Sequence, residues 1–165
     1  MNDPQGYKPP HSLDAEKSVL GAMLLDQELA VERLDALNTS DFFDRKHRMI
    51  FRACRQLDSR NSIIDMVTAS EELSRMKDLE QAGGVEYLAS LTDDIPLLSN
   101  VLEYIRIIKE KSMLRQLIKV SRESINEVLE GTDEVQTILD TAASKVMAIT
   151  ESRSYGEFKP ISQLV

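Results

Sequence analysis

The chain has 165 residues, a formal net charge of -8 and a pI of about 4.8. A protein whose main ligand is nucleic acid usually carries a basic surface, so the overall charge argues against that class. The single cysteine, Cys54, excludes an intramolecular disulfide and is typical of the reducing cytoplasm.

Neither a membrane anchor nor a secretory signal is predicted. No apolar run approaches the roughly 18 residues of a membrane-spanning helix, and residues 1–10 lack the apolar centre of a signal peptide. Aromatic residues make up only 5% of the chain, and no convincing alternating pattern of strand type is present. The sequence therefore predicts an all-α protein.

In chain order, residues 1–11 are predicted to form a flexible polar tail and residues 12–98 a compact helical head. Ser12 is expected to cap the first helix, whose first turn carries Asp14 and Glu16 at the positive helix end. The cleanest helical periodicity belongs to a later helix with Phe43, His47, Ile50, Cys54 and Leu57 on one face. Asp65 is expected to cap the next helix. After Gly83 and Gly84, a short helix is expected to turn Val85, Leu88 and Leu91 inward.

Residues 99–150 are predicted to form a long antiparallel helical hairpin. Its first helix covers residues 101–130, Gly131 suits the left-handed position after a helix end, and the return helix covers residues 135–149. The first helix is the longer one, so its first half is expected to dock on the head.

The apolar face of this hairpin is wider than one helix pair can cover, which predicts self-association with a second subunit. The residues expected at that interface are Leu114, Ile118, Ile125, Ile138, Leu139 and Val146.

Residues 151–165 are predicted to be a linker followed by the start of a linker helix. Phe158, Ile161 and Leu164 recur at helical spacing and are expected to dock that helix. Because the pattern stops in mid-course, the chain is interpreted as part of a larger protein.

No catalytic, cofactor-binding or metal-binding constellation is visible in the sequence. None of the six glycines precedes a lysine as in a phosphate-binding P-loop. His47 and Cys54 share a helix face, but zinc needs about four ligands, which favours a buried core histidine. Residues 103–123 are locally basic. This stretch is either a phosphate-binding face or, as the acidic chain favours, a solvated face with salt links.

Several segments resemble the amino-terminal domain of DnaB-type replicative DNA helicases, in order and spacing, from residue 10 to residue 165. The matching segments are Pro10-x-Ser12, Ala15-Glu16-x-Ser18-Val19-Leu20-Gly21, Asp41-Phe42, His47, Ile50-Phe51, Ile64-Asp65-x-Val67-Thr68, Gly83-Gly84-x-x-Tyr87-Leu88-x-x-Leu91, Tyr104-x-x-Ile107-Ile108-x-Glu110-Lys111 and Phe158-Lys159-Pro160-Ile161. One departure is Val101-Leu102, where many relatives have small residues.

The resemblance implies a non-catalytic domain for assembly and partner docking. In that family six copies form a collar, a trimer of dimers, above a ring of ATPase domains. The implied partners are other copies of the chain, primase and, in many bacteria, a helicase loader. ATP and Mg, like DNA, are expected only at the missing carboxy-terminal domain. Two alternatives stay open: a stand-alone α-helical adaptor or loader subunit, and a nucleic-acid-binding helical domain that uses the basic face.

Overall fold

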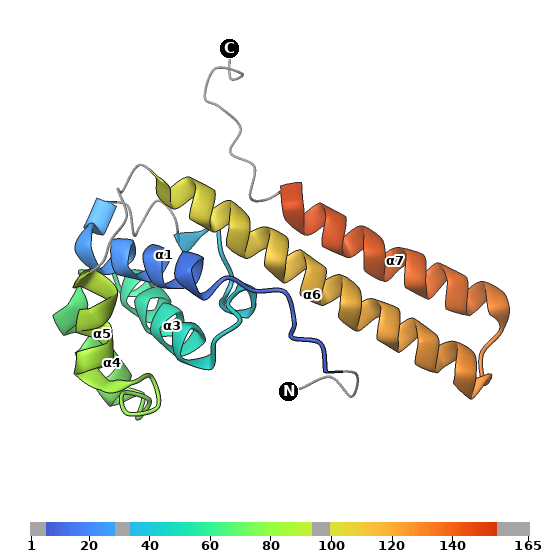
Figure 1. The fold of residues 1–165 in the computed structure, drawn as a ribbon, viewed down its shortest axis with the longest axis horizontal. Helices are drawn as coiled ribbons and strands as arrows, with labels where there is room; N and C mark the ends of the chain where they lie inside the picture. The colour runs from blue at the N-terminus through green and yellow to red at the C-terminus, as the bar shows by residue number, and fades with distance from the viewer. Residues whose placement is uncertain (1–5, 29–33, 94–99, 155–165) are drawn as a thin grey trace, which may run out of the picture. The chain divides into compact units, whose positions relative to one another are not determined.

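The structure is a computed structural model that describes residues 6–28, 34–93 and 100–154 (Figure 1). Every regular element in these ranges is helical, which confirms the all-α prediction. The chain divides into two compact units. The head unit is His11–Ser112, and the hairpin unit combines Met1–Pro10 with Met113–Val165.

The described part of the head unit begins with four α-helices and one turn of 3-10 helix. They are α1 (Leu13–Leu25), η1 (Thr39–Asp41), α3 (Arg45–Ser59), α4 (Met66–Arg75) and α5 (Gly84–Asp93). Ser12 caps α1 by accepting from the amide of Ala15, and Asp65 caps α4 by accepting from that of Thr68. Both caps were predicted, because a short polar side chain just before an apolar run satisfies amides that the helix itself leaves free.

The core of the head is made by these helices together with the first half of α6 (Val101–Glu130). Val101, Ile105 and Ile108 of α6 belong to the same buried cluster as Ile50 and Leu88. The prediction that the first half of the long helix docks on the head is therefore confirmed.

Two side chains in the head lie where the periodicity did not place them. Phe43 precedes α3, because Asp44 caps that helix by accepting from the amide of Lys46 at 2.7 Å. Phe43 instead stacks on His11, with ring centroids 4.3 Å apart. Val85 was expected to point inward but is 50% exposed, because it lies in the first turn of α5 at the rim of a shallow groove.

A buried polar chain joins three helices of the head. His47 is fully buried, as predicted, but its ring lies between Glu16 and Tyr87 rather than among apolar side chains alone. Its Nδ1 lies 2.5 Å from Glu16 Oε2, and its Nε2 lies 2.8 Å from the hydroxyl of Tyr87. Burial, and the nearby carboxylates of Asp44 and Glu16, raise the pKa of Tyr87. The phenol therefore keeps its proton and donates to Nε2 when the imidazole is neutral.

Glu16 also stabilises the start of α3. Its carboxylate accepts from the amides of Phe43 (2.5 Å) and Asp44 (3.3 Å), which lie immediately before that helix. The sequence placed Glu16 in the first turn of α1, where the helix dipole favours it, but gave no sign that it would be buried. Its burial is tolerated because these hydrogen bonds replace the hydration that the carboxylate loses.

The hairpin consists of α6 and α7 (Val135–Ser154), which run antiparallel (Figure 1). Helix α6 has the predicted bounds, and Gly131 follows it with a φ of 62°, in the left-handed region that favours glycine. Helix α7 runs on to Ser154 rather than ending at residue 149.

Candidate self-association surface

The six residues predicted for self-association lie on the two helices of the hairpin. Leu114, Ile118 and Ile125 of α6 are 46%, 39% and 57% exposed. On α7, Leu139 and Val146 are 59% and 42% exposed, whereas Ile138 is half-buried. The first five thus present apolar surface to solvent in the single chain. Their place at an interface between two subunits stays a prediction.

The hairpin has little interior of its own. Among the residues of α7 whose burial is described, Ile149 alone is buried, at 9% exposure. The two helices are instead linked by Lys145, whose Nζ lies 3.1 Å from a carboxylate oxygen of both Glu123 and Glu127. These two carboxylates raise the pKa of Lys145. Partly exposed ion pairs of this kind contribute only modestly to stability, so they do not take the place of a packed interior.

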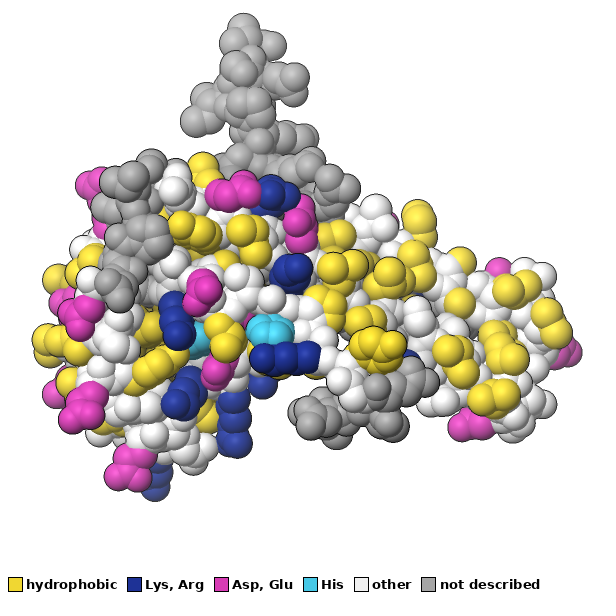
Figure 2. All heavy atoms as spheres, viewed as in Figure 1, with side chains coloured by type: hydrophobic (Ala, Val, Ile, Leu, Met, Phe, Trp, Pro, Cys, Tyr) yellow, Lys and Arg dark blue, Asp and Glu magenta, His cyan; other side chains and the backbone are white. Residues whose placement is uncertain are grey.

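Further exposed apolar side chains extend the predicted set. Figure 2 shows hydrophobic side chains over the face of the hairpin that is turned to the viewer. The additional residues are Leu117, Val128, Leu129, Val135 and Met147, at 43%, 61%, 78%, 74% and 61% exposure. Leu129 follows the predicted Ile125 by four residues and so lies on the same side of α6. An apolar surface of this extent is characteristic of a protein–protein interface.

Several charges of the locally basic stretch are engaged within the chain. Arg106 bonds Glu103 and Glu110 on its own helix, and Lys109 lies 2.6 Å from the buried carboxylate of Asp41. The Arg106 links are of the kind expected for a solvated helix face with salt bridges, the interpretation that the sequence favoured, whereas the pair of Lys109 and Asp41 is largely buried.

Two kinds of feature are absent from the described residues. No group of three or more His, Cys, Asp or Glu side chains lies close enough together to hold a metal ion. No described helix is both long and apolar enough to cross a bilayer. The residues predicted to dock the linker helix, Phe158, Ile161 and Leu164, lie outside the described residues.

The family model for the DnaB-like helicase N terminal domain matches residues 8–110. The chain belongs to this family. The matched stretch covers most of the head unit, including Glu16, His47 and Tyr87.

Solved structures extend the similarity into the hairpin. The crystal structure of the N-terminal domain of DnaB helicase from Mycobacterium tuberculosis superposes with a TM-score of 0.79 at 31% sequence identity. That match covers 86% of this chain and 99% of the other. A DnaB-like replicative helicase, solved in a study of its interactions with primase, shares the fold, with a TM-score of 0.74 at 23% identity. The match covers 90% of this chain and 33% of the chain of that helicase.

Among whole proteins, the replicative DNA helicase DnaB of Geobacillus stearothermophilus is 37% identical over 157 residues. The alignment covers 95% of this chain and 35% of the helicase. The chain thus spans about a third of the length of the helicases it matches.

Proposed function

We propose that this chain is the non-catalytic assembly and partner-docking domain of a hexameric, ATP-dependent replicative DNA helicase that acts in the cytoplasm. Membership of the DnaB N-terminal family supports this proposal, and so does the similarity to helicases about three times as long. ATP and Mg are assigned to the carboxy-terminal domain of such a helicase, and DNA is reached only through that domain. The same comparisons favour a helicase domain over a stand-alone adaptor or loader subunit.

Within that function, the hairpin is the proposed self-association surface. The observation that carries this step is the exposure of Leu114, Ile118, Ile125, Leu139 and Val146 on one antiparallel helix pair. Pairing with the hairpin of a second copy covers this surface and yields a dimer, three of which build a hexameric collar. Primase is the proposed further partner, because a structurally similar helicase was solved in a study of its primase interactions. A helicase loader is proposed as a partner on family grounds alone.

The proposal is tested by placing a charge at the predicted interface. In a two-fold dimer each substitution acts twice, and burying an unpaired carboxylate is costly. We expect Ile118→Asp or Ile125→Asp to give a folded monomer, measured by sedimentation velocity together with circular dichroism.

The matched control is Val67→Asp in the head, because Val67 is 63% exposed and Ile125 57%. The control is expected to keep the parental mass. If both hairpin variants also keep the parental helicity and mass, the hairpin is not the interface.

A further inference from the structure

The head unit carries a groove along the outward face of α4, beside the start of α5. These two helices lie side by side in the head (Figure 1). The groove has a volume of about 300 Å³. Its lining includes Met66, Val67, Ser70, Glu71, Leu79 and Val85, and it is called the α4 groove below. Ala69 and Leu73 of the same helix are buried, so the groove and the core lie on different faces of α4.

The α4 groove is mainly apolar. Met66 and Leu79 are half-buried and pack against the core, whereas Val67 and Val85 are 63% and 50% exposed. The hydroxyl of Ser70 donates to the carbonyl oxygen of Met66 at 2.7 Å, so its hydrogen-bonding capacity is used within the helix. Half-buried apolar side chains with exposed apolar ones beside them are typical of the centre of a protein–protein interface.

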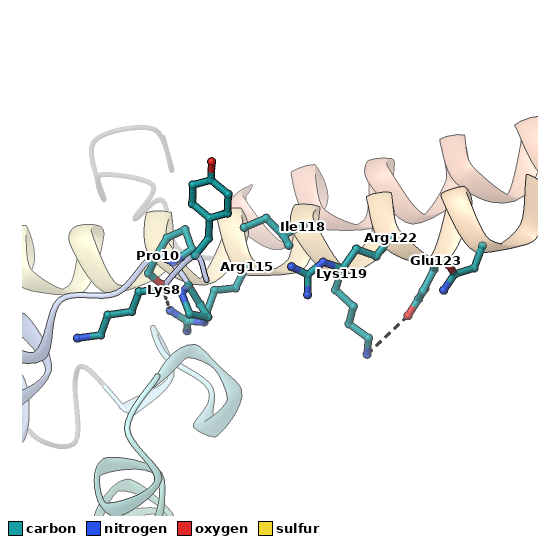
Figure 3. A pocket seen from close by; sticks show the side chains of 10 residues that line it. Lys8, Pro10, Arg115, Ile118, Lys119, Arg122 and Glu123 are labelled. Carbon is teal, nitrogen blue, oxygen red and sulfur yellow. Dashed lines mark hydrogen bonds and ion pairs between the residues drawn. The ribbon is translucent and has the colours of Figure 1, made fainter. Parts of the chain in front are cut away.

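The α4 groove is separate from the proposed self-association surface. It belongs to the head unit, whereas the residues of that surface belong to the hairpin unit. A larger groove, of about 690 Å³, lies between residues 7–10 and α6 and is lined by Ile118 (Figure 3). Because Ile118 is part of the self-association surface, that groove belongs to the proposed pairing of the hairpins. The exposed valines of the head need a different partner.

The charges around the α4 groove are acidic. Among the described residues that line it, Glu71 alone is charged, and it is exposed. Glu86, also exposed, follows Val85 in the first turn of α5. The neighbouring Glu72 is buried and bonded to Arg60 and Arg75, so its charge is balanced within the head. A partner with a cation opposite Glu71 is therefore favoured over an acidic one.

The shape of the α4 groove favours a helix as the docked element. An extended peptide commonly binds by adding a strand to the edge of a sheet, but the described residues contain no strand. A groove along a helix instead accepts the apolar side of an amphipathic helix, whose anchoring side chains recur every three or four residues. A volume of about 300 Å³ lies at the lower end for small-molecule sites, so it suits one or two side chains of a larger partner.

We propose that the α4 groove docks a basic amphipathic helix of a partner protein. Aliphatic side chains of that helix enter between Val67 and Val85, and a lysine or arginine faces Glu71. The apolar contacts supply most of the affinity, and the ion pair selects basic over acidic helices. This interaction goes beyond the proposed function, because it requires neither the pairing of the hairpins nor an ATPase domain.

The test titrates the full chain with a fluorescein-labelled synthetic peptide, followed by fluorescence anisotropy. The peptide has about 16 residues, enough to form a helix, with leucines at steps of three and four and lysines beside them. Val85→Lys replaces an apolar contact by a like charge, so binding is expected to weaken about tenfold. Val67→Lys, on the other side of the groove, should act similarly. Glu71→Lys reverses the one charge and should weaken binding about fivefold.

Matched variants control for folding and for net charge. Leu102→Lys is the control for Val85→Lys, because Leu102 is 51% exposed and each is the second residue of a helix in the head. Glu28→Lys is the control for Glu71→Lys, because Glu28 is exposed in the same unit and the net charge changes equally. Both controls are expected to bind like the parent, and circular dichroism checks that every variant keeps its helicity.

A second measurement locates the bound peptide. Methyl NMR of the parent is expected to show shifts at Val67, Leu79 and Val85 and none at Leu102. A control peptide with the same composition, but with its leucines spread around the helix, should bind about tenfold more weakly, because it has no apolar side to present.

Three results would overturn the inference. In the first, the peptide shows no saturable binding, or a peptide with glutamates in place of the lysines binds as well. In the second, the groove variants bind as tightly as Leu102→Lys, which places the peptide elsewhere. In the third, Val67→Lys and Val85→Lys lower the sedimenting mass of the chain, which assigns the groove to a contact between copies. The proposed function is tested separately by Ile118→Asp and Ile125→Asp, so each can fail while the other stands.

Discussion

The head and the hairpin are built from similar residues but bury them differently. In the head unit Phe42, Ile50 and Phe51 are completely buried, whereas in the hairpin Val128 and Leu129 expose more than half of their surface. A helix pair offers one line of contact, while the described helices of the head together enclose a core. The head is therefore expected to be stable as a single chain, and the hairpin to gain much of its stability from a partner.

The largest expected contrast comes from truncating one isoleucine in each unit. Ile50→Ala should lower the free energy of unfolding by about 2–5 kcal/mol, because it leaves a cavity in a close-packed core. Ile125→Ala, at a site 57% exposed, should cost the monomer less than about 0.5 kcal/mol. Urea denaturation at a protein concentration that keeps the chain monomeric measures both. If the two substitutions lower the free energy of unfolding equally, the head and the hairpin do not differ in packing as described.

The buried carboxylate of the head gives the next effect. Glu16→Gln removes the charge that accepts from two backbone amides and from His47, so a loss of about 1–3 kcal/mol is expected. Asp14→Asn is the control, since Asp14 lies exposed in the same helical turn. Thermal unfolding followed by circular dichroism compares the two. If they are equally stable, the polar chain contributes nothing to the head.

One glycine in a turn of each unit allows the stability of the head and of the hairpin to be compared. Gly131 in the hairpin has a φ of 62° and open space around the position of a Cβ atom, so Gly131→Ala should cost only the left-handed conformation, about 1 kcal/mol. Gly83 in the head has a φ of 101°, and a Cβ atom would lie 2.7 Å from that of Tyr87. Gly83→Ala should therefore cost more than Gly131→Ala in the same denaturation experiment. The reverse order would mean that Tyr87 has room to move.

The stability of the head is also expected to depend on pH. Arg75, whose Nη2 lies 2.6 Å from Glu72 Oε1, and Arg60, which bonds the other oxygen, lower the pKa of Glu72 from 4.5 to about 2. The folded state thus binds this proton more weakly than the unfolded state. The stabilisation is complete above about pH 4.5 and is lost as the pH falls towards 2.

Replacing Glu72 tests this dependence. Glu72→Gln should flatten the decline of stability between pH 4.5 and 2, whereas Glu71→Gln, at an exposed neighbour, should leave it unchanged. Stability is measured by denaturation at a series of pH values. If Glu72→Gln loses stability between pH 4.5 and 2 as the parent does, the ion pairs of Glu72 do not cause the pH dependence of the head.

The sequence by itself determined the helical class and much of the local structure. The bounds of α6, the caps at Ser12 and Asp65 and the left-handed Gly131 were all predicted correctly. Each depends on residues within one or two turns of the chain, where side-chain type acts directly on neighbouring backbone groups. The order and spacing of the motifs also identified the family correctly, because motifs spread along the chain depend on the fold as a whole rather than on a single contact.

The tertiary structure alone decided which polar side chains are buried and which apolar ones are left uncovered. Glu16 is buried because α3 and Tyr87 lie beside it, 27 to 71 residues further along the chain. The carbonyl oxygen of Pro10 accepts from Arg115 Nη1, which lies 105 residues further along the chain. Helical periodicity shows which side of a helix is apolar, but it carries no information on what packs there. Burial depends on the neighbours that the fold supplies, and for the hairpin the proposed neighbour is a second copy of the chain.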